Sequence, residues 1–312
     1  MQQKMDNKKQ ITVIGATGNI GVPVVKNLIS VGFRIKAIVR NTERAKKLFD
    51  YSEHVEIVKA DLQDVQSLQS ALKNTEYVYL NLSTLSADIN VPFAEERDGI
   101  ENILKALDKN TIKQIIQISG LGALDNHDSQ YTFRFIPNII RKQGQKLIKE
   151  SGIPYTILHC SWFFDSFIFY QRNNVYSVIG NDTNPIYFTN CYDFTQHLIN
   201  AIGNEKAFYK ELPVQGKKGY IHSAAANEFF AVFSEKSKVK ALPTTIISIL
   251  AFFIKKMRFV KHMSDYFNST SESHLVDEYA TYSILGEPQF DVKDYAKWLK
   301  ENQFYNYLMD KK

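Results

Sequence analysis

The chain has 312 residues, of which 44% are hydrophobic and 23% charged, so it is long enough to bury a sizeable core and too apolar for general disorder. We expect its net charge of +5 to be modest and spread along the chain, which argues against a nucleic-acid partner. No Cys/His cluster has metal-ligand spacing, and no run reaches the roughly 18–20 apolar residues of a membrane span, so we expect neither a metal site nor a transmembrane segment.

The N-terminal residues and the cysteines bear on location. The first ten residues contain three lysines and no apolar run, which predicts that there is no secretory signal. Cys160 and Cys191 are then expected to stay reduced, as in the cytoplasm.

Short β-rich runs alternate with helical patterns through the first half of the chain. In chain order we predict a strand at 11–14, a helix at 20–31, a strand at 34–39, a helix at 45–49, a strand at 55–59, a helix at 65–72, a strand at 77–82, a helix at 93–107, a strand at 112–119, a helix at 139–150 and a strand at 155–158. This alternation predicts an α/β fold of the Rossmann type, a doubly wound parallel sheet with helices on both faces.

The pattern loosens after residue 160. The stretch 162–170 is rich in aromatic residues, 189–202 suits a strand end followed by a helix, and further helices are predicted at 227–233, 245–260 and 292–301. We therefore expect a Rossmann core over residues 1–160. Residues 161–312 are expected to hold the remaining core elements and a smaller, mostly helical substrate lobe, interleaved with the core.

One segment of this second half is both apolar and basic. The run 246–254 is interrupted only by Ser248 and is followed by Lys255, Lys256 and Arg258. It suits either an amphipathic helix that lies on the surface or a lobe helix that packs on the core or lines a substrate pocket. We favour the second interpretation.

A glycine-rich loop follows the first predicted strand and opens the first predicted helix, with the sequence Gly15-Ala16-Thr17-Gly18-Asn19-Ile20-Gly21. Gly15 permits a sharp turn out of the strand, Gly18 lets a pyrophosphate approach the backbone, and Gly21 allows the helix to pack tightly on the sheet. The N–H groups and the positive dipole end of that helix suit phosphates. A glycine-rich turn without a ligand is the alternative.

The glycines are three residues apart, and this spacing resembles the short-chain dehydrogenase/reductase superfamily. More narrowly, the segment from Ile14 to Gly21 resembles its atypical branch of NmrA-like NAD(P)-binding proteins. The resemblance continues at Val39-Arg40-Asn41 with Arg44, at Ala60-Asp61-Leu62, and at the segment 151–158. It covers roughly the first 200 residues, and it matches the last third of the chain only loosely.

The resemblance implies roles for further residues. Asp61 is expected to bond the adenine amino group, and Leu62 to flank the adenine ring. Asn81, Leu82 and Ser83, at the end of the fourth predicted strand, are expected to run along the ribose. A plain turn at the end of a strand is the alternative for each.

Two arginines bear on the choice of dinucleotide. Arg40 ends the second predicted strand, where a carboxylate would favour NAD(H), and Arg44 follows one helical turn later. Guanidinium groups give paired, charge-assisted hydrogen bonds to a phosphate. We therefore predict that NADP(H) is preferred over NAD(H). Solvated surface charges are the alternative.

The resemblance also implies a serine at the end of the fifth strand and a Tyr-x-x-x-Lys pair on the next helix. Ser119 fits the serine position, although a structural serine is the alternative. Pro137 occupies the tyrosine position and Arg141 the lysine position, so Arg141 is expected to hold ribose without serving as a titrating base. Tyr131 is the tyrosine nearest to this position in the sequence and is a second catalytic candidate. The lysine of the pair would then fall four residues later, where the chain has Phe135.

The residues that end the sixth predicted strand depart from the family pattern. His159 suits a proton donor or a hydrogen-bonded structural residue, and we favour the structural role. Four aromatic residues suit either a pocket wall or the core: Trp162, Phe163, Phe164 and Phe167.

These residues support two hypotheses of different kinds. The first is an NADPH-dependent oxidoreductase for a small carbonyl or quinone-like substrate. The second is a sensor that binds NADP(H) and regulates a protein partner without turnover, because the dinucleotide loop is intact while the tyrosine–lysine pair is missing. A sugar-nucleotide epimerase relative is disfavoured, because epimerases normally retain that pair.

Overall fold

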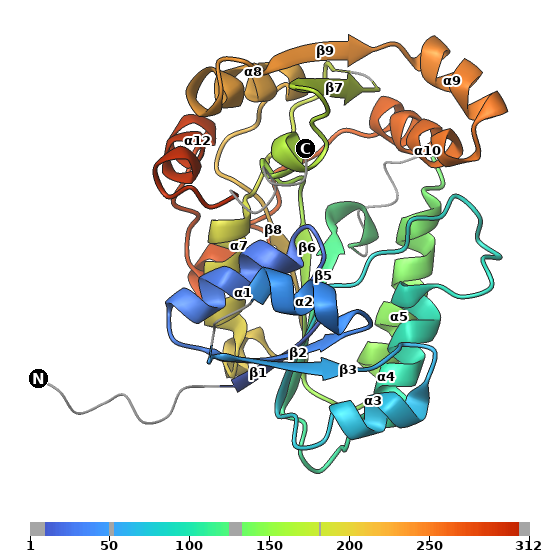
Figure 1. Cartoon of the computed structure of the whole chain (residues 1–312), viewed down its shortest axis with the longest axis vertical. Coiled ribbons are helices and arrows are strands. Elements are labelled where there is room, and N and C mark those ends of the chain that lie inside the picture. The colour runs from blue at the N-terminus through green and yellow to red at the C-terminus, as the bar shows by residue number, and fades with distance from the viewer. Residues whose placement is uncertain (1–9, 50–52, 125–132, 181, 306–312) are drawn as a thin grey trace, which may run out of the picture.

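The computed structural model describes residues 10–49, 53–124, 133–180 and 182–305. Its main sheet has seven parallel strands in the order β3-β2-β1-β4-β5-β6-β8 (Figure 1). These strands are β1 (Gln10–Ile14), β2 (Arg34–Val39), β3 (Val55–Lys59), β4 (Tyr77–Leu80), β5 (Gln114–Gly120), β6 (Tyr155–Cys160) and β8 (Lys210–Val214). The predicted Rossmann-type fold is confirmed.

Helices cover both faces of this sheet (Figure 1). One face packs against α1 (Gly21–Ser30), α2 (Thr42–Phe49) and α7 (Cys191–Ala201). The other packs against α3 (Val65–Ala71), α4 (Ile100–Ala106), which follows the π-helical turn η1 (Glu95–Gly99), and α5 (Ile136–Glu150). The described residues also form four short helical elements: η2 (Leu121–Ala123), α6 (Ser166–Phe169), η4 (Glu205–Ala207) and α11 (Thr281–Leu285).

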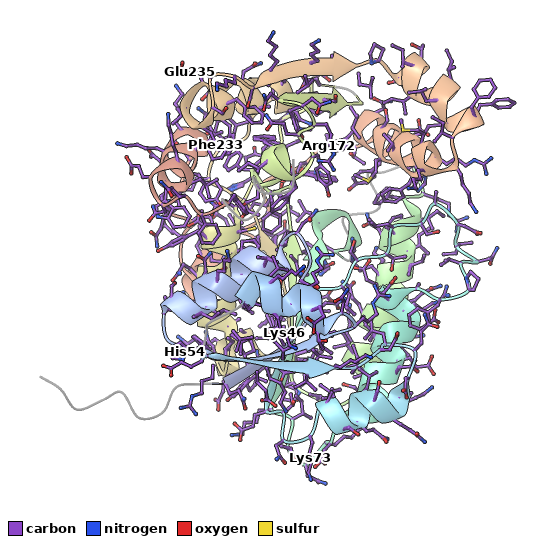
Figure 2. The ribbon with its side chains drawn as sticks, viewed as in Figure 1. Lys46, His54, Lys73, Arg172, Phe233 and Glu235 are labelled. Atoms are coloured by element: carbon purple, nitrogen blue, oxygen red, sulfur yellow. The ribbon has the colours of Figure 1, made fainter. Side chains whose placement is uncertain are left out.

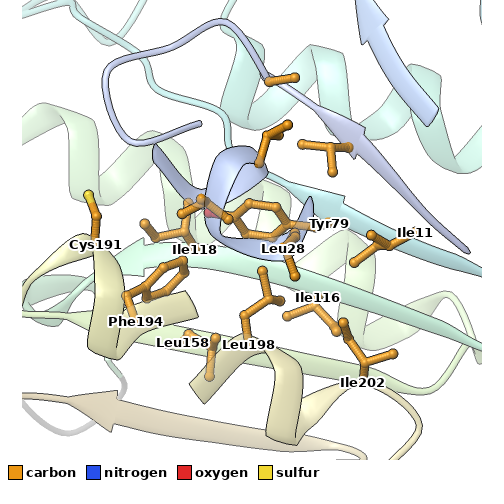
Figure 3. Close-up of a cluster of buried hydrophobic side chains, with 14 of the residues drawn as sticks. Ile11, Leu28, Tyr79, Ile116, Ile118, Leu158, Cys191, Phe194, Leu198 and Ile202 are labelled. Carbon is orange, nitrogen blue, oxygen red and sulfur yellow. The ribbon is translucent and has the colours of Figure 1, made fainter. Parts of the chain in front are cut away.

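The core between the sheet and α1 and α7 is mainly aliphatic. Figure 3 shows Leu28 of α1 together with Phe194 and Leu198 of α7, which pack over Tyr79 and Ile116 of the sheet. Central strands such as β1 and β4 are apolar and buried on both faces because each face is covered by helices. This two-sided burial is why the strands appear in the sequence as short continuous apolar runs.

The edge strand β8 is a core element that the sequence pattern did not predict. It pairs with β6 in parallel, and Pro213 lies opposite His159. Its sequence, Lys-Glu-Leu-Pro-Val, combines two charged residues with a proline, and proline is tolerated in sheets mainly at edges because it cannot donate to the ladder.

The C-terminal lobe lies beyond the carboxyl ends of the core strands (Figure 1). It contains a two-stranded parallel sheet of β7 (Val175–Ile179) and β9 (Lys238–Leu242), together with α8 (His222–Phe233), α9 (Thr244–Phe253), α10 (Lys255–Ser269) and α12 (Val292–Glu301).

The small sheet of the lobe was not predicted. The single helix predicted at 245–260 is wrong, because the backbone is extended at Ile254 and the segment forms two helices that pack on each other. The division at residue 160 stays a prediction.

Candidate functional site

The glycine loop joins β1 to α1, and the fold itself requires two of its three glycines. Gly15 has a φ of +88°, and a Cβ there would lie 2.1 Å from the carbonyl oxygen of Asn81. A Cβ on Gly21 would lie 2.2 Å from the carbonyl oxygen of Gly15. The predicted turn at Gly15 therefore occurs. The space at Gly21 is as tight as predicted, but its nearest neighbours are the loop backbone and the Asn81 side chain.

Gly18 is in a different situation. Its φ is not left-handed, and a Cβ there would meet its nearest neighbour, the carbonyl oxygen of Gly15, at 3.3 Å. Gly18, Asn19 and Ile20 line a cavity, whereas Ala16 is buried. The internal packing of the loop therefore demands a glycine less strictly at position 18 than at positions 15 and 21. A glycine that leaves its backbone open toward a cavity fits a cradle for a pyrophosphate.

The carboxyl end of β4 braces this loop. The side-chain amide of Asn81 donates a hydrogen bond to the carbonyl oxygen of Gly15 at 3.1 Å, and Leu82 and Ser83 line the same cavity. The structure thus gives Asn81 a supporting role in the loop that the sequence did not suggest. The contact of residues 81–83 with a ribose stays a prediction.

The residues expected to select the dinucleotide follow β2, and those expected to contact its adenine follow β3. Arg40 is exposed at the end of β2, and Arg44 Nη2 donates to the carbonyl oxygen of Thr17 at 3.0 Å, which places its guanidinium at the glycine loop. Asp61 is exposed after β3, and its Oδ1 accepts from the Gln63 N–H at 3.0 Å. Leu62 is half-buried beside Gly99.

Ser119 and Arg141 both line the cavity. The Ser119 hydroxyl accepts a hydrogen bond from the side-chain amide of Gln145 at 2.8 Å. Arg141 forms an ion pair with the fully buried Glu96, with 2.6 Å between Nε and Oε1, and also donates to Asn138 Oδ1 at 2.9 Å. The ion pair holds the guanidinium in place. Tyr131, the other catalytic candidate, lies outside the described residues.

His159 occupies a structural position. Its ring is fully buried, with Nε2 3.0 Å from Glu211 Oε2 and Nδ1 3.3 Å from the carbonyl oxygen of Gly120. Both ring nitrogens thus have partners between neighbouring strands, which agrees with the structural interpretation. The four aromatic residues divide between the alternatives: two line the cavity and two belong to the buried core of the lobe, namely Trp162 and Phe163 on one side and Phe164 and Phe167 on the other.

The cavity has a volume of about 500 Å³ and extends from the glycine loop into the lobe. Its core half carries the loop, the ends of β4 and β5, and Arg141. Its lobe half is mainly aromatic, with side chains from α10 and from the segment after β6: Trp162, Phe169, Phe259, Met263, Tyr266 and Phe267. A polar loop therefore opens into an apolar chamber, an arrangement typical of ligand sites.

Glu272 is the carboxyl group at the wall of this chamber. Its Oε2 accepts from the Ser161 hydroxyl at 2.9 Å, and its Oε1 accepts from Gln215 Nε2 at 2.7 Å and from the Tyr187 N–H at 3.3 Å. Burial raises the pKa of Glu272 to about 7, against these three donors, which lower it. Its carboxyl group therefore exchanges a proton near neutral pH.

Sequence reasoning missed Glu272 and the wall formed by α10. Ser161 and Glu272 are 111 residues apart, and Glu272 lies in an irregular segment after α10. No local motif marks such a pair, because only the placement of the lobe over the sheet brings it together.

A family model described as NAD(P)H-binding matches residues 15–185, which is more than half of the chain. The chain belongs to the NAD(P)H-binding family. This match confirms the resemblance drawn from the glycine loop.

Curated relatives match this chain at low identity, over most of its length in one case and over about half of it in another. The photosystem II assembly factor Ycf39 of Synechocystis sp. is 21% identical over 264 residues, which cover 82% of this chain and 77% of the relative. An uncharacterized chloroplastic protein of Arabidopsis thaliana is 29% identical over 161 residues, which cover 48% of this chain and 58% of the relative.

Solved structures share the fold. The NADPH-dependent quinone oxidoreductase QOR2 of Escherichia coli, complexed with NADPH, has a TM-score of 0.68 at 21% identity, over 93% of this chain and 99% of that one. The negative transcriptional regulator NmrA, in complex with NADP, has a TM-score of 0.67 at 13% identity, over 97% and 98% of the two chains. At these identities the likeness shows the fold alone.

Proposed function

We propose that this protein is an NADPH-dependent reductase for a small, apolar carbonyl or quinone-like substrate, acting in the cytoplasm. The observation that carries the proposal is the continuous cavity from Gly18 to the aromatic wall of the lobe. A dinucleotide whose pyrophosphate lay at the glycine loop would direct its other end into that chamber. The apolar wall favours an uncharged, flat substrate.

The proton for such a reduction needs a source other than a tyrosine on α5, because Pro137 occupies that position. When bound, NADPH supplies a hydride to the substrate carbon. Glu272 holds a proton at the chamber wall near neutral pH, oriented by Ser161 and Gln215, and we assign it the transfer of that proton to the substrate oxygen. Water then returns a proton to the carboxylate.

The test is oxidation of NADPH, followed by its absorbance, with a panel of quinones and aldehydes. We expect turnover in the wild type and a loss of about 10²–10⁴-fold in kcat for Glu272→Gln on carbonyl substrates, the usual contribution of a positioned acid. The wild-type rate is expected to fall as the pH rises through about 7, where Glu272 loses its proton. Glu235→Gln, an exposed carboxylate before β9, is the matched control. Full activity of Glu272→Gln would remove it from the mechanism.

The preference for NADP(H) is part of the same proposal. Two observations support it: Arg44 donates a hydrogen bond to the carbonyl oxygen of Thr17 in the glycine loop, and Arg40 is exposed directly after β2, and guanidinium groups suit a 2′-phosphate. We expect Arg40→Asp to weaken NADPH binding by about tenfold or more and to spare NADH, because a carboxylate repels the phosphate. Arg34→Asp, at the other end of β2, is the control. Equal affinity of the wild type for both dinucleotides, measured by titration, would refute the preference.

One observation favours a second function. Arg141 is held by the buried Glu96, and Pro137 lies in the first turn of α5. At the positions of the family's tyrosine and lysine, this helix therefore offers an anchoring group and no transferable proton. This arrangement suits a sensor that binds NADP(H) and alters a contact with a regulatory protein partner. Tight NADPH binding with no turnover across the whole panel would favour the sensor over the reductase.

A further inference from the structure

One stretch of the lobe concentrates the positive charge of the chain. Residues 236–264 contain seven lysines and arginines and no aspartate or glutamate. Since the whole chain carries +5 and this stretch carries +7, the remaining residues together carry −2. The expectation that the charge is spread along the chain is therefore wrong. The positive charge lies on and around β9, α9 and the start of α10.

Within this stretch α9 has an exposed apolar face. Ile247 and Ala251, one helical turn apart, are buried and hold the helix on the lobe. On the outer side, Ile249, Phe252 and Phe253 are 61%, 79% and 78% exposed. Figure 1 shows α9 at the outer end of the lobe. The interpretation that the apolar run packs on the core or lines the pocket is thus wrong for this face of α9.

Three exposed cations directly follow the apolar face. Lys255, Lys256 and Arg258 lie in the first turn of α10, which contains no acidic residue, and none forms an ion pair with a described carboxylate. Cations at a helix N-terminus oppose the helix dipole, so this placement works against local helix stability. The acidic residue before the stretch, Glu235, lies at the far end of β9 (Figure 2). Local conflicts of this kind are expected where a segment serves binding.

We propose that the outer face of α9 and the cations at the start of α10, called here the α9 surface, dock this protein onto an anionic lipid membrane. With ten residues, α9 is about 15 Å long, roughly half the thickness of the hydrocarbon layer. None of the helices in the described ranges is long and apolar enough to cross a bilayer. The phenylalanines enter the boundary between headgroups and acyl chains, while the adjacent cations meet anionic headgroups.

The charge of the α9 surface distinguishes this occupant from a second copy of the chain. Two copies that met through this face would bring Lys255, Lys256 and Arg258 of each close together, and like charges at an interface oppose association. An anionic bilayer instead complements both the cations and the apolar face.

Docking through this surface brings the cavity close to the lipid. α10 packs on α9, and Phe259, Met263 and Tyr266 of α10 line the cavity. An apolar ligand dissolved in the bilayer thus has a short path to the chamber. Membrane docking itself is independent of the proposed reduction and is tested without turnover.

The experiment is sedimentation of the full chain with vesicles of phosphatidylcholine alone or with about 30 mol% phosphatidylglycerol. We expect binding to the anionic vesicles and little to the neutral ones. The Phe252→Ser/Phe253→Ser variant is expected to bind at least about tenfold more weakly, since each ring buries apolar area. Lys255→Gln/Lys256→Gln is expected to lose about fivefold per charge. Lys46→Gln/Lys73→Gln, whose lysines lie on the core away from α9 (Figure 2), should match the wild type.

Three outcomes would overturn the proposal. The first is the absence of wild-type binding to anionic vesicles. The second is vesicle binding that the phenylalanine variant retains in full. The third is a wild-type dimer, detected by light scattering, that the phenylalanine variant converts to a monomer without any vesicle binding, because the α9 surface would then be a contact between copies. All variant sites are exposed, so circular dichroism is expected to show unchanged folding.

Discussion

The Rossmann core and the C-terminal lobe are packed with different kinds of side chain. The core is held mainly by aliphatic residues, such as Ile11 and Leu28, on strands and helices that alternate regularly through the first half of the chain and are joined by α7 and β8 from later in it. The lobe is held by aromatic rings such as Phe167, Tyr176 and Phe229, on elements that do not alternate regularly. Regularly alternating strands and helices leave a periodic pattern in the sequence, whereas an aromatic cluster on irregularly ordered elements leaves only an aromatic composition.

The strongest test of this comparison is Phe167→Ala. Phe167 is fully buried and contacts the rings of Tyr176, Phe188 and Phe229, so its truncation is expected to cost about 3–5 kcal/mol in the free energy of unfolding. Urea unfolding monitored by tryptophan fluorescence measures this cost, because the two tryptophans of the chain, at 162 and 298, both pack against the aromatic cluster of the lobe.

A control and a second probe sharpen this result. Phe252→Ala, at a residue that is 79% exposed, is expected to change the stability by no more than about 0.5 kcal/mol. Circular dichroism reports the helices of the core as well as those of the lobe. In the Phe167→Ala variant, the urea midpoints measured by circular dichroism and by fluorescence can be compared. If they differ, the lobe unfolds by itself and the two regions are independent units.

Two glycines of the core provide the next comparison. Gly21→Ala places a Cβ 2.2 Å from a backbone oxygen and is expected to cost about 1–3 kcal/mol of stability. Gly18→Ala has 3.3 Å to its nearest neighbour and is expected to cost less than about 1 kcal/mol, yet to weaken NADPH binding by about tenfold or more. Urea unfolding and NADPH titration separate the two effects. Unchanged affinity in Gly18→Ala would mean that no phosphate approaches this glycine.

The smallest expected effect concerns Glu272, at the junction of the two regions. Its pKa is about 7 in the folded chain, above its ordinary value of 4.5, so the folded state binds an additional proton between these values. The resulting stabilisation is full below pH 4.5 and is lost as the pH rises through about 7, by on the order of 1 kcal/mol after allowance for partial solvent screening. Glu272→Gln should remove this part of the pH dependence of urea unfolding. An identical pH profile in the variant would show that the carboxyl group keeps its ordinary pKa.

The accuracy of the sequence-based predictions follows the same division. The bounds predicted for β2 and β3 match the structure, and β1 differs by one residue, because each is a short β-rich run between clear turn signals. The strands β7 and β9 were missed, and the bounds of α8 and α9 were misplaced, because aromatic and basic residues obscure the periodicity there. The core strand β8 was missed as well, because its two charged residues and its proline are atypical of a strand. The cavity places Gly18, Asn81 and Ser119 together, as the ends of parallel strands must. The roles of these residues toward a dinucleotide remain predictions.

By itself the sequence determined the doubly wound core and the glycine loop, because buried parallel strands and tight turns impose local requirements on residue type. Only the tertiary structure decided what lies opposite that loop. Ser161 and Glu272 meet across 111 residues, and the pKa of Glu272 depends on the burial produced by that meeting. The tertiary structure also decided which face of α9 stays exposed. An apolar run in the sequence does not tell which of its residues pack on the lobe and which remain on the surface.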